Sequence, residues 1–236
     1  MGHPAGPRRG SRPLGRAELK RAGAPGRIFG RAVVTVHADG PAPVREPFHR
    51  DGWVYEEKVD GWRILAYKDG NRVRLISRNG RDHTRRFHDI AVAVSKLAAR
   101  TLVLDGEVAI FDQKLRSRFE WLREPDPDAV ATPPMFIPFD VLHRNGRDLT
   151  GRPLRERRAR LEDVVANNDL VLPVRRLARN GFEAWSEVIA RDCEGYVAKD
   201  EASPYEGGPT LRWVKVKQKG WTDAEDGWKR RISAGA

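Results

Sequence analysis

Lys58 begins a short run, Lys58 to Arg63, whose residue types can perform covalent chemistry. A lysine amine, with an ordinary pKa of about 10.4, is a poor nucleophile at neutral pH until nearby cations or loss of solvent activate it. We predict that Asp60 orients the amine and that Gly61 permits close backbone approach. Arg63 would offer a planar pair of donors to a phosphate or ribose. This chemistry is attack by a lysine on phosphorus.

Other residues along the chain fit a nucleotide site around this lysine. Side chains alternate along a strand, so Glu56 shares a face with Lys58, and Lys215 shares a face with Lys217. Two lysines backed by valines suit a triphosphate better than a packed core. The remaining candidates are an arginine at a turn, an aromatic side chain that can stack on a base, and two carboxylates beside glycines: Arg78, Phe139, Glu107 and Glu194.

Each candidate also has an ordinary structural interpretation. Lys58 alone would be a solvated surface lysine. Glu107 and Glu194 would be members of structural ion pairs. Phe139 would be an ordinary core residue. Lys215 and Lys217 would form a solvated strand face. The number and order of the motifs favour the functional interpretation.

Hydrophobic periodicity predicts the elements that must position these residues. Helical spacing begins at Phe87, after Pro153 and at Phe182, and the helix after Pro153 has Leu154, Arg158 and Leu161 on one face. The turn Asp69-Gly70-Asn71 predicts a hairpin. Strands are predicted at 53–58, 62–68, 72–78, 101–111, 135–142, 195–199 and 211–217, with a short one at 33–36 and a short helix and loop within 114–133. The pattern predicts an α+β fold with two antiparallel-rich sheets and flanking helices.

Composition narrows the class of protein. The 236 residues are 39% hydrophobic and 33% charged, enough apolar material for one core. They contain no apolar run long enough to cross a membrane and no secretory signal, so we expect no membrane partner. The single cysteine, Cys193, rules out an internal disulfide and suits a reducing cytosol. The histidines show no metal-binding spacing.

The net charge of +11 favours a polyanionic partner such as nucleic acid. Residues 1–31 hold eight basic residues against one acidic residue, which gives +7 of that total. We predict a disordered basic arm at 1–31, a catalytic domain at 32–220 and a short basic tail at 221–236. The arm is either a non-specific nucleic-acid clamp or a solubilising segment, and composition does not separate the two.

A series of motifs in the family's order makes the chain resemble the covalent nucleotidyltransferases, closest to the adenylylation domain of bacterial ATP-dependent DNA ligases of the end-joining type. The likeness covers about 53–220 and, beyond the run at Lys58, is carried by 77–80, 104–107, 139–142, 145–149, 194–199 and 213–217. It implies the ligase nucleotidyltransferase fold, which is similar to ATP-grasp domains.

The resemblance implies a role for each candidate residue. Lys58 would form the phosphoramide with AMP, and Glu56 would read the adenine amino group. Phe139 would stack on the base. The other implied roles are contacts to ribose and phosphate for Arg63 and Arg78, ribose or metal binding for Glu107, metal binding for Glu194, and charge neutralisation at the α-phosphate for Lys215 and Lys217.

The implied activity is ATP-dependent sealing of nicked or broken duplex DNA, with Mg²⁺ or Mn²⁺, in repair. AMP would pass from the lysine to a 5′-phosphate, and a 3′-hydroxyl would then displace it. The resemblance also implies a bacterial cytoplasmic, nucleoid-associated monomer, with a repair protein as a further partner. Two alternatives stay open: an RNA ligase with the same chemistry, and a non-catalytic nucleic-acid-binding module that keeps the nucleotide pocket.

One family feature is missing from the sequence. Such ligases continue past the final lysine-rich strand into an OB-fold, a small barrel that binds nucleic acid. Only 19 residues follow Lys217 here, so we expect no OB-fold. The interpretations are a minimal ligase, an isolated adenylylation domain, or an enzyme that relies on a partner.

Overall fold

The structure is a computed structural model that describes residues 41–208, 210–219 and 221. These residues all belong to one compact unit, Thr35–Ala236. The predicted arm at 1–31, the predicted strand at 33–36 and the predicted tail apart from Trp221 lie outside the described residues.

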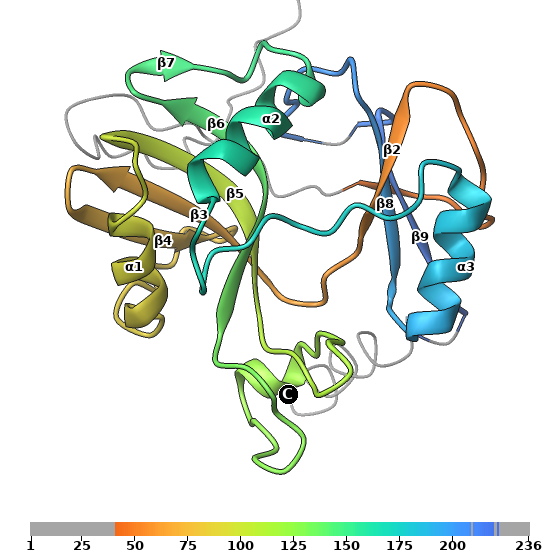
Figure 1. Cartoon of the computed structure of the whole chain (residues 1–236), viewed down its shortest axis with the longest axis horizontal. Coiled ribbons are helices and arrows are strands. Elements are labelled where there is room, and N and C mark those ends of the chain that lie inside the picture. Colours follow the sequence, from red (N-terminus) through yellow and green to blue (C-terminus); the bar gives the residue numbers. More distant parts are fainter. Residues whose placement is uncertain (1–40, 209, 220, 222–236) are drawn as a thin grey trace, which may run out of the picture. The chain divides into compact units, whose positions relative to one another are not determined.

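The larger sheet has five strands in the order β4-β3-β5-β6-β7, each antiparallel to its neighbours (Figure 1). Asp69 pairs with Arg72, so β3 and β4 are joined by a two-residue turn, and Gly70 adopts the positive φ of +57° that such turns favour. The bounds are β3 Trp62–Asp69, β4 Arg72–Ser77, β5 Thr101–Ala109, β6 Met135–Arg144 and β7 Arg147–Asp148.

The smaller sheet has four strands in the order β1-β9-β8-β2. Strand β8 is antiparallel to both β2 and β9, and β1 runs parallel to β9. Neither sheet closes into a barrel within the part of the chain that the structure describes. The bounds are β1 Ala42–Pro43, β2 Trp53–Glu57, β8 Gly195–Asp200 and β9 Trp213–Lys217.

Three helices pack on the two sheets. Helix α1 (His88–Ser95) packs on β3 and β4, and α2 (Leu154–Val165) packs on β6. Helix α3 (Gly181–Arg191) packs on β2 and β8 (Figure 1), and begins after Asn180, whose side chain accepts the backbone N–H of Phe182 at 2.9 Å. A 3₁₀ turn covers Glu120–Leu122. Among the described residues no helix is long and apolar enough to span a membrane.

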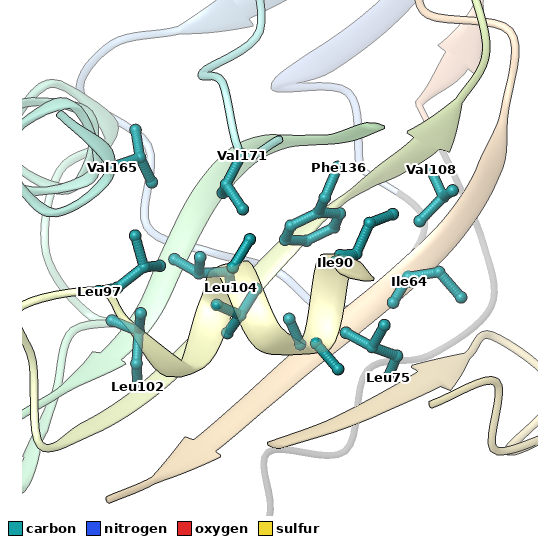
Figure 2. Packing of buried hydrophobic residues seen from close by; sticks show 14 of the residues in the cluster. Ile64, Leu75, Ile90, Leu97, Leu102, Leu104, Val108, Phe136, Val165 and Val171 are labelled. Carbon is teal, nitrogen blue, oxygen red and sulfur yellow. The ribbon is translucent and has the colours of Figure 1, made fainter. Parts of the chain in front are cut away.

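Each sheet has its own hydrophobic core. Under α1, Ile90 and Leu97 meet side chains of the larger sheet such as Leu75, Leu104 and Phe136 (Figure 2). Under α3, the smaller sheet packs around Tyr55, Tyr196, Val188 and Ala184. The two cores anchor the sheets independently, so the residues between the sheets are free to be polar.

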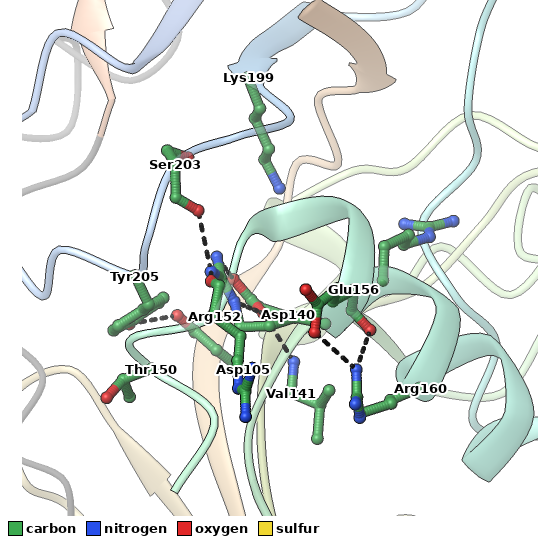
Figure 3. Close-up of polar contacts among 12 residues, drawn as sticks. Asp105, Asp140, Val141, Thr150, Arg152, Glu156, Arg160, Lys199, Ser203 and Tyr205 are labelled. Carbon is green, nitrogen blue, oxygen red and sulfur yellow. Dashed lines mark hydrogen bonds and ion pairs between the residues drawn. The ribbon is translucent and has the colours of Figure 1, made fainter.

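A buried ion pair fastens α2 to β6. Arg157 and Asp140 are both 0% exposed, and the guanidinium donates from Nε and Nη2 to the two carboxylate oxygens at 2.8 Å each. Arg157 Nη1 also donates to the carbonyl oxygens of Ser203, at 3.0 Å, and of Arg152. Figure 3 shows Asp140 with Arg152 and Ser203 near it. The pair therefore joins the larger sheet to the loop after β8.

The predicted α+β class with two antiparallel-rich sheets is confirmed, as are the hairpin and the three helices. The two-residue strands β1 and β7 were not predicted, because two residues show no period. The strand predicted at 53–58 is one residue too long, since β2 ends at Glu57 and Lys58 lies directly after it. The strand predicted at 211–217 begins at Trp213.

We predict that Arg157→Met destabilises the fold strongly. Asp140 would be left as an unpaired buried charge, which costs about 3–5 kcal/mol. Urea unfolding would measure the change. The matched control is Arg160→Met on the same helix, whose ion pair with Glu156 is exposed (Figure 3) and should contribute less than about 1 kcal/mol. Similar losses in the two variants would contradict the prediction.

Candidate active site

A cavity of about 580 Å³ lies between residues of the two sheets. That volume is in the usual range for ligand sites. Eight of the ten predicted site residues line it, contributed by both sheets and the segments that follow their strands: Glu56, Lys58, Asp60, Arg63, Arg78, Glu107, Phe139 and Lys215. The other two are linked to Lys58: Glu194 pairs with Lys58, and Lys217 pairs with Glu194.

Lys58 is held by the end of a neighbouring strand. Its backbone N–H donates to the Gly195 carbonyl at 3.0 Å, and its Nζ donates to Glu194 Oε2 at 2.6 Å. Lys217 Nζ lies 2.7 Å from the other oxygen, Oε1. The Glu194 side chain is 1% exposed, so it is a buried carboxylate shared by two ammonium groups. A Cβ at Gly195 would lie 2.0 Å from the Val216 carbonyl oxygen, so glycine is required beside Glu194.

Asp60 lies beside Lys58 but does not hydrogen-bond its amine. Its Oδ2 accepts the backbone N–H of Phe119 at 3.2 Å, and its own N–H donates to Ser117 Oγ at 2.8 Å. Burial, reinforced by the charge of Glu194, raises the pKa of Asp60 to about 6. The structure therefore gives the contact that orients the amine to Glu194, and it ties Asp60 to the 111–130 segment.

Glycine at position 61 is a packing requirement. A Cβ there would lie 2.5 Å from the Val108 carbonyl oxygen, because the chain enters β3 directly against β5. The position therefore has the close backbone approach predicted for Gly61, between two residues, Lys58 and Arg63, that both line the cavity.

Arg63 is fixed by a carboxylate and a tyrosine. Its Nε and Nη2 donate to the two oxygens of Asp105 at 3.1 and 2.8 Å, and Tyr205 donates its hydroxyl to Asp105 Oδ2 at 2.7 Å (Figure 3). The two bonds to Asp105 occupy one edge of the Arg63 guanidinium. Arg63 and Phe139 both line the cavity, and Arg63 Cζ lies 5.5 Å from the centroid of the Phe139 ring. Asp105 and Tyr205 thus set the direction of Arg63.

Glu107 pairs across the strands with Arg63 and has an unusual environment. Its Oε2 is buried and has no hydrogen-bond partner. Burial raises the pKa of this carboxyl to about 8, although Arg63 and Lys58 act to lower it. A buried carboxylate oxygen without a partner is a free acceptor for a hydroxyl or a cation.

One part of the cavity lining combines aromatic and charged side chains. Phe139 is half-buried and lines the cavity, so it is not a core residue, and it meets Trp213 edge-on at 6.1 Å. Lys199 Nζ lies 4.5 Å from the Phe139 ring centroid and 4.1 Å from that of Trp213. Glu56 lies in the same wall, and its carboxylate is ion-paired with Lys199 and Arg158.

The remaining cations lie where the sequence predicts. Arg78 follows β4 and is exposed while lining the cavity. Lys215 and Lys217 are half-buried on β9, whereas Val214 and Val216 between and beside them are buried, which confirms the predicted alternation. Lys215 lines the cavity and Lys217 faces Glu194.

Three contacts that shape the site have no counterpart in the sequence patterns: Arg158 with Glu56, Tyr205 with Asp105, and Asp105 with Arg63. Arg158 contacts Glu56 across 102 positions and Tyr205 contacts Asp105 across 100, so local patterns do not pair them. One signal was present, because Arg158 falls between Leu154 and Leu161 on the apolar face of its helix. A buried arginine requires a carboxylate partner.

The predicted metal ligands, Glu107 and Glu194, do not form a ready-made cage. Within residues 41–208, 210–219 and 221, no three or more His, Cys, Asp or Glu side chains are grouped as a metal site. Metal binding by these two residues stays a prediction.

The model of the ATP dependent DNA ligase domain family matches residues 38–217, which include every residue of the cavity described above. This chain belongs to that family. The resemblance inferred from the motifs is thereby confirmed.

Relatives of this ligase domain include end-joining proteins. It is 31% identical over 171 residues to the multifunctional non-homologous end joining protein LigD of Pseudomonas aeruginosa, covering 71% of this chain and 20% of that protein. It is 39% identical over 170 residues to a probable DNA ligase of Beutenbergia cavernae, covering 68% of this chain and 33% of that protein. The chain therefore spans about a fifth to a third of these curated relatives.

Solved structures agree with the sequence relatives. The ligase domain of LigD from M. tuberculosis matches with a TM-score of 0.66 and 29% identity, covering 76% of this chain and 60% of that one. A mycobacterial DNA ligase D complexed with ATP and MES matches with a TM-score of 0.65 and 27% identity, with the same coverage. The two-sheet fold is therefore that of ligase domains.

We predict that Glu107→Gln stabilises the ligand-free domain at high pH. A carboxyl whose pKa is higher in the folded chain stabilises the fold below its unfolded value of 4.5 and loses that contribution as the pH rises through about 8. Glutamine cannot ionise, so the free energy of unfolding of the variant should gain about 2–3 kcal/mol over wild type between pH 6 and pH 9.

Urea unfolding in metal-free buffer across this pH range would measure the difference. The matched control is Glu124→Gln, a change at an exposed residue that should leave a constant offset. A difference from wild type that does not change with pH for Glu107→Gln as well would show that ionisation of Glu107 does not destabilise the fold.

Proposed function

We propose that this chain is the adenylylation domain of an ATP-dependent DNA ligase and that it carries AMP covalently on Lys58. The observation that carries the proposal is the position of Lys58: it lines the cavity, its Nζ lies 2.6 Å from a buried carboxylate, and cations, Phe139 and Glu56 line the same cavity. We place the domain at 32–220, between the basic arm at 1–31 and the tail at 221–236.

The first step forms a bond between Lys58 Nζ and the α-phosphorus of ATP and breaks the bond to pyrophosphate. The amine must first give up a proton, and Glu194 Oε2 is the acceptor within hydrogen-bond distance. Lys215 and Arg63 line the same cavity and are placed to neutralise the phosphate charge that develops. The protein mainly positions the reacting groups.

Other residues that line the cavity would bind the nucleoside. Phe139 would stack on the base, Glu56 would accept a hydrogen bond from its amino group, and Glu107 would accept one from a ribose hydroxyl through its unpartnered oxygen. Arg78, exposed at the edge of the cavity, would meet either the nucleotide or the 5′-phosphate of a DNA end.

The residues fit a bound Mg²⁺ or Mn²⁺. Mg²⁺ is commonly held by one or two carboxylates together with waters and substrate phosphates, so the absence of a larger acidic group among the described residues is no obstacle. Glu107 has an unpartnered oxygen for this role. Both oxygens of Glu194 lie against lysines, and AMP on Lys58 would remove one of those charges. A bound ion would supply charge neutralisation at the phosphates.

The later steps and their setting follow from the family. AMP would pass to the 5′-phosphate of nicked or broken duplex DNA, and the 3′-hydroxyl would displace it. The end-joining name of the LigD relatives supports a role in repair, in the bacterial cytoplasm at the nucleoid, with a repair protein as partner. We expect a monomer. The DNA ligase family match favours DNA over RNA and catalysis over mere binding.

We predict that the wild-type protein takes up label from ATP labelled at the α-phosphate and that Lys58→Ala takes up none. The reason is that Lys58 is the only nucleophile that the proposal assigns. The control Lys96→Ala changes an exposed lysine at the end of α1 and should label as wild type does. Equal labelling of Lys58→Ala would overturn the assignment.

We also predict that Lys58→Ala still seals nicks whose 5′ end already carries AMP. That reaction skips the lysine, so it separates the first step from the last. Sealing would be followed on nicked duplexes with DNA or RNA at each side of the break. A strong preference for RNA ends would contradict the DNA assignment.

A further inference from the structure

Glu56 is buried in the wall of the cavity between two cations. Its side chain is 2% exposed, and those of Arg158 and Lys199 are 4% and 3% exposed. Arg158 Nη1 donates to Glu56 Oε1 at 2.9 Å, and Lys199 Nζ lies 2.6 Å from Oε2. Two cations on opposite oxygens of one buried carboxylate hold it in one orientation.

The carboxylate of Glu56 can accept more hydrogen bonds than the two cations supply. Arg158 Nη1 lies against Oε1 and Lys199 Nζ lies 2.6 Å from Oε2. A carboxylate has about four acceptor sites, so each oxygen can also accept from a second donor. Because Glu56 lines the cavity, a ligand donor at this wall could use one of the remaining sites.

Both cations are themselves held from several elements. Arg158, on α2, also donates to Glu162 at 2.8 Å and to the Val174 carbonyl at 2.5 Å. Lys199, on β8, lies between the rings of Phe139 and Trp213 (Figure 3 shows its side chain directed toward α2). The cations therefore bring the carboxylate and the aromatic wall into one rigid unit.

The chemistry of purines makes such a carboxylate selective. The edge of adenine presents an amino donor at the 6-position, whereas guanine presents an oxygen acceptor there. An ionised carboxylate only accepts, so it attracts the amino group and repels the oxygen. A protonated or reoriented carboxyl would lose this discrimination.

We propose that Arg158 and Lys199 are positioning residues that hold Glu56 as a fixed acceptor for the 6-amino group, and thereby set the preference for ATP over GTP. The inference deepens the proposed function and rests on it for the identity of the ligand. Neither cation needs to touch the nucleotide's amino group, because each acts through Glu56.

The test compares three nucleotides that differ at the 6-position: ATP, GTP, and purine riboside triphosphate, which has hydrogen there. Dissociation constants would be measured by calorimetry without divalent metal, so that no covalent transfer is needed. Wild type should bind ATP at least about tenfold more tightly than either of the others, as one hydrogen bond to a charged group allows.

Lys199→Met should weaken ATP binding about tenfold and leave binding of purine riboside triphosphate nearly unchanged, because the lost interaction is the one with the amino group. Lys199→Arg retains a cation and should recover part of the preference. Arg158→Met should act in the same direction. The control Lys96→Met makes the same chemical change at an exposed position and should alter nothing.

Two outcomes would overturn the inference. One is equal affinity of wild type for ATP and purine riboside triphosphate. The other is an equal loss of affinity for both nucleotides in Lys199→Met, which a merely structural role of Lys199 would give. Labelling of Lys58 is read separately. Selective ATP binding without labelling would reject the proposed function while supporting the role of the two cations.

Discussion

The carboxylate of Glu194 joins three strand ends, and the arrangement of the site depends on it. Lys58 follows β2, Glu194 precedes β8, and Lys217 ends β9, so the two ion pairs of 2.6 and 2.7 Å fix these ends relative to one another. A buried carboxylate without partners would be strongly unfavourable, and each lysine reduces that cost. The nucleophile is therefore positioned by the same contact that stabilises its surroundings.

Two carboxylates on β5 differ in whether the protein itself supplies their hydrogen-bond partners. Asp105 is satisfied by Arg63 and Tyr205, and it serves to aim the arginine. Glu107, two residues further along the same strand, has an oxygen with no partner and a raised pKa of about 8. Native proteins rarely leave such a group unless function requires it. The imbalance is thus concentrated where a nucleotide and its counter-ion would bind.

The sequence predicted the parts of the fold that have a local cause. The hairpin followed from Gly70 and alternation, and the helix after Pro153 followed from its period. The strands β1 and β7 exist only because longer strands pair with them, so nothing in their two residues identifies them. For the same reason Asp60 was assigned to orient the lysine, although the contact comes from Glu194, 136 positions away.

Two buried ion pairs on neighbouring residues of α2 have different consequences. Arg157 and Asp140 lie away from the cavity and bind backbone carbonyls, so their pair serves the fold. Arg158 pairs with Glu56 in the cavity wall, and Lys199 adds a second cation. Buried charges commonly stabilise no more than apolar residues of the same volume would. The three buried charges of Arg158, Glu56 and Lys199 beside an aromatic wall are therefore better explained by recognition of a polar ligand than by stability.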